Sequence, residues 1–207
     1  MSSQDWRRQR RIGFLAIAVS LLVGAGLWIA IRHHVPVITG MDAVGVRMAY
    51  ALKCCVLACI FTLGMGIEAV AHERLQTSAF DPLSGEPGRR LKVNQRYLQN
   101  TLEQFILFTV GLFGLALYSP DGDAMRAVAA TTATWILARL VFWIGYHRSA
   151  ALRALGAWSM LLSQLMLLYV GACVGGEMAG TAGAWAVLGA VALFEAALFW
   201  LTRERAG

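Results

Sequence analysis

Residues 96–118 of this chain read RYLQNTLEQFILFTVGLFGLALY, a polar segment that runs without a break into an apolar one. In a helix, Arg96, Asn100 and Glu103 stand at i, i+4 and i+7, which places all three on one face. Charged groups that enter a bilayer on one face are costly, so they need partners or a ligand. The stretch therefore predicts a membrane helix with a binding site near its surface end.

The composition of the whole chain is typical of a membrane protein. Of its 207 residues, 58% are hydrophobic and only 14% are charged, whereas soluble domains carry about 25% charged residues. The apolar residues form continuous blocks, each long enough to cross a bilayer of ~30 Å as a helix. A β-barrel is not expected, because the blocks do not alternate between polar and apolar residues. Six spans are predicted, at 12–31, 43–71, 103–118, 124–146, 152–175 and 180–201.

Basic residues gather in alternate connections between these spans. They collect before residue 12, between 74 and 96, between 148 and 153, and at Arg203 and Arg205, while the other connections are poor in them. This positive-inside pattern predicts a multi-pass protein of the cell's inner (plasma) membrane, with both termini and the candidate site in the cytoplasm. It also accounts for the net charge of +6 without a nucleic-acid partner. The first span is interpreted as an uncleaved signal anchor.

A second motif follows in residues 138–153, which read ARLVFWIGYHRSAALR. Arg139, Tyr146 and Arg153 stand at heptad spacing and so repeat along one helix face. Arginine binds carboxylates through a planar fork of donors and stays charged at any working pH. The two motifs together predict a pocket for a small anionic ligand at the membrane surface. The cysteines match no zinc pattern and are interpreted as small apolar filler, so no metal site is predicted.

The motifs Arg-x-x-x-Asn-x-x-Glu and Ala-Arg-x-x-x-x-x-Gly-Tyr-x-Arg-Ser-x-x-Leu-Arg, in this order, resemble the MAPEG family of membrane-associated proteins in eicosanoid and glutathione metabolism. The second is closest to the branch of the leukotriene-forming glutathione synthase. The resemblance covers 43–175 and implies an all-α four-helix membrane bundle, usually a homotrimer with glutathione between subunits. The chain would add a basic tail, an extra transmembrane helix and an outer loop at 1–42, and another helix with a basic tail at 176–207.

The resemblance also implies roles for individual residues. Arg153 is implied to be catalytic, because it would hold the glutathione thiol as a thiolate. The residues implied to bind the cofactor glutathione are Arg96, Asn100, Glu103, Arg139, Tyr146, Arg148 and Arg74. For Arg148, a side chain that only reaches to lipid phosphate is an equal alternative. Glu103 and Arg139 are also open to a purely structural interpretation as an interhelical ion pair.

The implied activity is that of a glutathione transferase, with glutathione peroxidase activity as a variant. A free thiol has a pKa of about 8.5, and a neighbouring guanidinium favours the thiolate, which is the nucleophile. The bilayer would deliver a lipophilic electrophile or hydroperoxide as the small-molecule substrate. Two positions depart from the family: Phe142 replaces a pocket tyrosine of close relatives, and Ala154 replaces a serine of the prostaglandin-forming branch. Prostaglandin synthesis is therefore not expected.

Two other functions stay open. One is a non-catalytic member of the same fold that binds a lipid or a partner protein. The other is a small transporter, because Lys53, Glu68 and Glu195 fall inside apolar spans and intramembrane charges often mark ion paths. The chain shows no repeat or broken-helix pair of the transporter kind. Glu68 and His72, at i and i+4, are expected to form a local pair.

Overall fold

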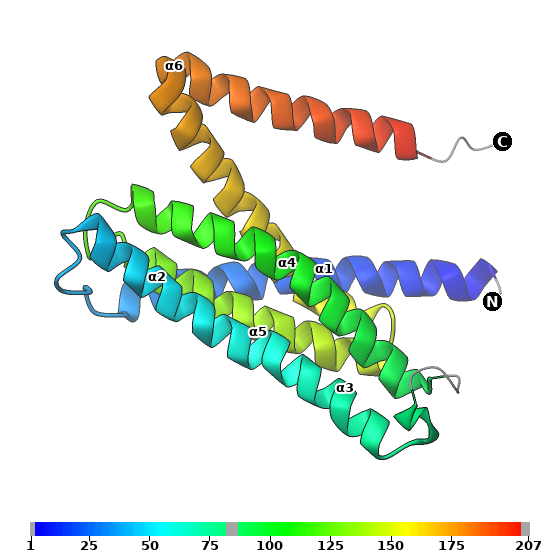
Figure 1. Ribbon diagram of the computed structural model, residues 1–207. Coiled ribbons are helices and arrows are strands. Elements are labelled where there is room, and N and C mark those ends of the chain that lie inside the picture. Colours follow the sequence, from blue (N-terminus) through cyan, green and yellow to red (C-terminus); the bar gives the residue numbers. More distant parts are fainter. Residues whose placement is uncertain (1–2, 82–86, 204–207) are drawn as a thin grey trace.

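The computed structural model of the chain describes residues 3–81 and 87–203, and every regular element in those two stretches is helical (Figure 1). The elements are α1 (Ser3–His34), α2 (Val44–Cys59), the π-helical segment η1 (Ile60–Gly64), α3 (Met65–Leu75), the 3₁₀ turn η2 (Ser78–Phe80), α4 (Arg89–Tyr118), α5 (Arg126–Arg148), the 3₁₀ turn η3 (Leu152–Gly156) and α6 (Ala157–Thr202). No break separates α2, η1 and α3, which together form one long helical stretch.

Five helical stretches of the described chain are long and apolar enough to cross a membrane. The last of them, Leu152–Thr202, reverses direction at Ala179 and Gly180, and Gly180 has a φ of 61° that favours glycine. Figure 1 shows the two arms of α6 folded into a V. Each arm is long enough, at ~1.5 Å per residue, to span ~30 Å, so the sixth predicted span corresponds to the second arm. The chain is an all-α, multi-pass integral membrane protein.

Several helix boundaries differ from the prediction. The basic residues before position 12 belong to α1, and α4 begins at Arg89 rather than near 96–103. The helices therefore extend beyond the apolar blocks, because their charged first turns can be hydrated outside the hydrocarbon region. Arg153 lies on the 3₁₀ turn η3, which precedes the helix expected from 152. Residues 82–86 of the connection between η2 and α4, and Arg205, lie outside the described residues.

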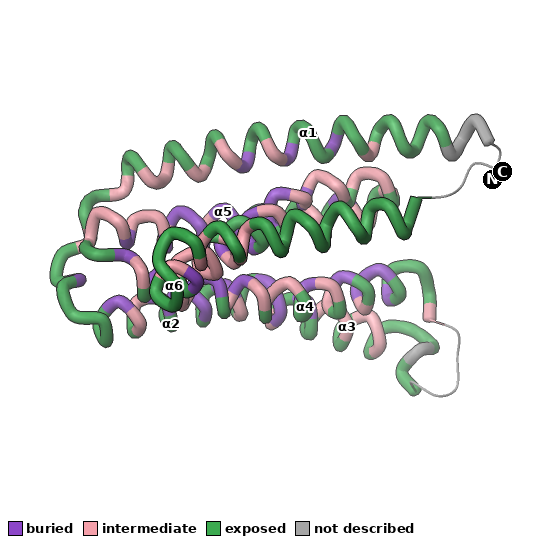
Figure 2. Tube along the Cα trace, turned by 90° about the horizontal axis from the view of Figure 1, so that it is seen from above, coloured by how far each residue is buried: buried purple, intermediate pink, exposed green. Residues whose placement is uncertain are grey.

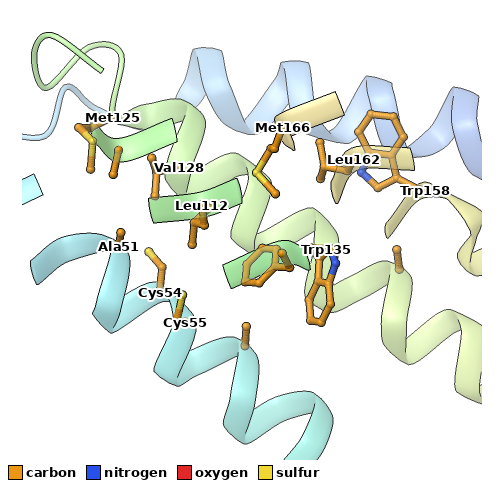
Figure 3. Close-up of a cluster of buried hydrophobic side chains, with 14 of the residues drawn as sticks. Ala51, Cys54, Cys55, Leu112, Met125, Val128, Trp135, Trp158, Leu162 and Met166 are labelled. Carbon is orange, nitrogen blue, oxygen red and sulfur yellow. The ribbon is translucent and has the colours of Figure 1, made fainter. Parts of the chain in front are cut away.

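The core lies where α2, α4, α5 and the first arm of α6 meet (Figure 3). Phe108 stacks on Trp135 with ring centroids 4.4 Å apart, and the Trp135 indole donates to Ser163 Oγ at 3.1 Å. Cys54 and Cys55 are buried free thiols in this cluster, as the sequence predicted. Glycines bring α4 against α6, since a Cβ at Gly111 would lie 3.0 Å from Met166.

The first helix, α1, packs along α5 and η3. The Trp28 indole donates to Thr131 Oγ1 at 2.9 Å, and Arg32 forms an ion pair of 2.8 Å with Asp123. The hydrogen bond from Arg32 holds the pKa of the Asp123 carboxyl below its ordinary value. The second arm of α6, in contrast, is almost entirely exposed (Figure 2).

Candidate functional site

A cleft of about 300 Å³ opens where the first half of α4 meets the end of α5 and η3. Its walls come from three elements of the chain. The lining residues are Arg96, Gln99, Asn100, Glu103, Phe142, Tyr146 and Arg153. The structure thus brings together five of the residues that the sequence predicted for the site, although they come from segments about 50 residues apart in the chain.

The α4 wall is a row of hydrogen-bonded polar side chains along one helix face. Arg96 Nη1 donates to Gln99 Oε1 at 3.3 Å, and Gln99 Nε2 donates to Glu103 Oε1 at 3.4 Å. Gln99 was missed by the sequence prediction, although its spacing of three from Arg96 and four from Glu103 is the signal that would have found it. These three side chains are exposed, so their polar groups are accessible to a ligand.

Arg139 lies behind this wall and does not line the cleft. It is 2% exposed, and its Nη2 donates to Asn100 Oδ1 at 3.0 Å and to Thr101 Oγ1 at 2.7 Å. Arg139 and Glu103 do not form an ion pair in the structure. It therefore does not contain the interhelical pair that was the purely structural interpretation of these two residues. Thr101 was also missed; it is fully buried next to the predicted Asn100. Arg139 therefore orients the Asn100 side chain from the buried side of the cleft wall.

Aromatic rings surround the buried Arg139 guanidinium. Its carbon lies 4.3 Å from the centroid of the Phe142 ring and 5.6 Å from that of Tyr97. Tyr97 in turn stacks on Trp143 at 4.6 Å and donates its hydroxyl to the Thr62 carbonyl in η1 at 3.3 Å. The positive charge is thus balanced by ring faces and neutral oxygens, while its Nε, also buried, has no hydrogen-bond partner.

Arg153 forms the opposite wall. Its guanidinium lies 5.4 Å from the Tyr146 ring, and the structure shows no hydrogen bond or ion pair from it to the described residues. Small residues let η3 approach α5 closely, because a Cβ at Gly156 would lie 2.7 Å from the Ala138 carbonyl oxygen. The Ser149 hydroxyl accepts from the Leu152 amide at 3.1 Å and fixes the start of the turn. Arg153 is therefore positioned by the backbone and has its donors available.

The other predicted residues lie elsewhere. Arg74, in the last turn of α3, and Arg148, exposed at the end of α5, do not line the cleft of a single chain. The Arg74 Nε is buried without a partner. Glu68 and His72 form the expected pair at 3.7 Å on the surface. Lys53 and Glu195 are exposed on the outside of the bundle, so neither lines a path through its interior.

The sequence is similar to those of known membrane proteins. The profile of the MAPEG family matches residues 48–173, a range that contains every residue of the cleft. Two similar curated proteins are both called Transmembrane protein 79. The one from Bos taurus is 29% identical and that from Mus musculus 28% identical, each over 122 residues. The match covers 59% of this chain but only 30% of each relative. No solved structure matches the chain.

Proposed function

The chain belongs to the MAPEG family, and on that premise we propose that it binds glutathione in the cleft and activates its thiol for transfer to a lipophilic electrophile. Reduction of a lipid hydroperoxide to its alcohol is the variant of this activity, in which a second glutathione from solution completes the disulfide and one water is released. The motif of the leukotriene-forming branch in 138–153 supports the transferase type. The observation that carries the proposal is the convergence of Arg96, Glu103 and Arg153 on one cleft.

The charges of the cleft fit this ligand. Glutathione carries two carboxylates, one ammonium and one thiol. Arg96 can bind a carboxylate through its fork, and Glu103 can accept from the ammonium. Asn100, oriented by Arg139, offers its amide N–H groups because its oxygen is already engaged. One carboxylate and the ammonium of the peptide part thus each have a partner of opposite charge in the cleft, and Asn100 adds a neutral donor.

Arg153 is the proposed catalytic residue. Its guanidinium has no polar partner in the described chain and faces the same cleft as the peptide-binding groups. A cation beside a sulfur favours the deprotonated form. When bound, glutathione supplies the sulfur that forms a bond to the electrophile. Arg153 stabilises the negative charge on that sulfur, and the thiol proton passes to water at the exposed rim.

A homotrimer would complete the site. The cleft of a single chain is open on its outer side, with Arg96, Glu103 and Arg153 exposed. A second subunit can supply the missing wall, and Arg74, whose buried Nε lacks a partner, is the proposed contribution from that subunit. We place the cleft on the cytoplasmic side of the inner (plasma) membrane, because its end of the bundle carries the basic residues. The lipophilic substrate then enters from the adjoining bilayer.

The decisive experiment is glutathione binding to the detergent-purified full chain by calorimetry, with ultraviolet difference absorbance to detect the thiolate. We expect binding with a thiolate signal in the unmodified protein. Arg153→Ala should keep measurable binding and lose the thiolate signal. Arg148→Ala is the matched control, because it removes an exposed arginine at the same end of the bundle but outside the cleft. A thiolate signal that is equal in Arg153→Ala and the unmodified protein excludes the catalytic role.

A non-catalytic binding protein is the second candidate. Phe142 lies in the cleft without the hydroxyl that close relatives of the transferase type carry there. The name that the two similar proteins carry, Transmembrane protein 79, is not that of an enzyme activity. In that case glutathione, or another small anion, binds without a thiolate signal in the same experiment, and no binding up to millimolar concentration directs the search to lipids.

A further inference from the structure

Two charged residues lie on the outer surface of the membrane-spanning helices. Lys53 is exposed on α2 among Leu52, Val56 and Leu57, which are themselves 48–54% exposed. Glu195 is exposed on the second arm of α6 beside Phe194 and Phe199, which are 71% and 72% exposed. Neither side chain forms an ion pair or a hydrogen bond with any residue that the structure describes. Both therefore face the surroundings of a single chain from an apolar surface.

This exposure would be costly if lipid were the only neighbour. Ionisable groups within membrane spans almost always face a protein interior or pair with one another. The two residues cannot meet within one chain, because α2 and the second arm of α6 lie on opposite sides of the bundle (Figure 1). An apolar helix needs no partner in lipid, but these two opposite charges do.

The positions of the two residues along their helices lie within ~8 Å of each other. Lys53 stands nine residues after Val44, where α2 begins, which is ~14 Å along the helix. Glu195 stands fifteen residues after Gly180, where α6 reverses, which is ~22 Å along the arm. Both α2 and the second arm of α6 begin at the end of the bundle opposite the start of α4, next to which the cleft lies (Figure 1). The remaining offset of ~8 Å is within the reach of a lysine and a glutamate side chain that extend toward each other.

We propose that the second arm of α6 of one copy packs against α2 of another copy, with Glu195 of the first paired to Lys53 of the second. The partner is thus a second copy of this chain, and charge complementarity selects it. The proposal is independent of glutathione. It gives the second arm, which meets the first arm of its own α6 at Gly183 and Val187, the role of joining subunits.

Carbodiimide cross-linking of the full chain in native membranes tests this pairing. A membrane-permeable carbodiimide activates a carboxyl group, and a neighbouring amine then replaces it as an amide. The sequence holds only two lysines, Lys53 and Lys92. We expect cross-linked dimers or larger species in denaturing gels, with a joined peptide that contains Lys53 and Glu195. Lys53→Arg, which keeps the charge but loses the amine, should reduce this species at least tenfold, whereas Lys92→Arg should not.

Exchange of the charges provides a second measurement. Lys53→Glu and Glu195→Lys should each lower the temperature at which the purified oligomer dissociates, because each leaves like charges facing one another. The double variant should restore it. The matched control combines Lys53→Glu with Glu68→Lys, which has the same net charge but places the lysine on α3. Absence of the joined peptide between chains, or a double variant no more stable than the control, overturns the proposal.

Discussion

Replacement of Thr101 by valine tests whether a hydroxyl holds the buried Arg139 guanidinium. Thr101 is fully buried and accepts from Arg139 at 2.7 Å. Hydrogen bonds to charged groups contribute about 1.5–3 kcal/mol, and valine keeps nearly the same shape, so the packing loss is small. After the change Asn100 is the one remaining side chain of the described residues that accepts from the guanidinium. The Arg139 Nε lacks a partner already in the unmodified protein. We expect a loss of about 2 kcal/mol, which lowers the unfolding temperature of a chain of this size by roughly 4–8 °C.

The matched control is Thr134→Val. Thr134 is 2% exposed, and its hydroxyl donates to two neutral carbonyls of its own helix, that of Ala130 at 2.8 Å and that of Thr131 at 3.4 Å. A neutral hydrogen bond of this kind contributes about 0.5–1.5 kcal/mol, so the loss should be clearly smaller. Thermal unfolding of the two variants in the same detergent makes the comparison. Equal losses in Thr101→Val and Thr134→Val would refute the special role of the contact with Arg139.

Three further changes follow from the structure. Glu103→Gln should weaken glutathione binding about tenfold or more and keep the thiolate signal per bound ligand, as measured by titration calorimetry and difference absorbance. Lost expression without a specific loss of binding would contradict this expectation. Gly156→Ala forces η3 away from α5, which should lower the free energy of unfolding by about 1–3 kcal/mol and reduce the affinity for glutathione. Its control is Gly176→Ala, where the added Cβ meets open space, and this change should affect neither unfolding nor binding. The pKa of Asp123 is lowered in the folded state. The contribution of this carboxylate to stability is therefore present above its ordinary pKa and is lost as pH falls through the lowered value, below about 4. The unfolding temperature of Asp123→Asn should depend less on pH in that range than that of the unmodified protein.

The sequence predicted the membrane class and the placement of the apolar spans because hydrocarbon solvation depends on composition alone. It did not predict where helices end in water. The motif at 96–103 lies within α4, since Arg89 and Arg90 extend the helix beyond the apolar block. Hydropathy does not register such an extension, because charged residues with good helix propensity form helix equally well outside the bilayer.

The candidate site was predicted in part for a related reason. Arg96, Asn100 and Glu103 share a face by helical spacing, and the structure places them in one cleft. Arg139 and Tyr146 also share a face, but two turns separate them, which is ~10 Å of depth along α5. Spacing gives the direction of a side chain and not its depth against the neighbouring helix. Tyr146 therefore reaches the rim with Arg153, while Arg139 lies beneath Asn100.

The π-helical segment η1 sets the register between the two halves of the span from Val44 to Leu75. A π-turn accommodates an extra residue in a helix, and here it leaves the Thr62 carbonyl as the acceptor for the Tyr97 hydroxyl. Deletion of one residue in η1 that restored a regular α-helix would turn everything after it by about 100° and shorten it by ~1.5 Å. The face of α2 in the core would stay in place, but Arg74 would point to a different neighbour. Residue count at this one turn, more than the identity of its residues, thus decides which surface the last part of the span presents.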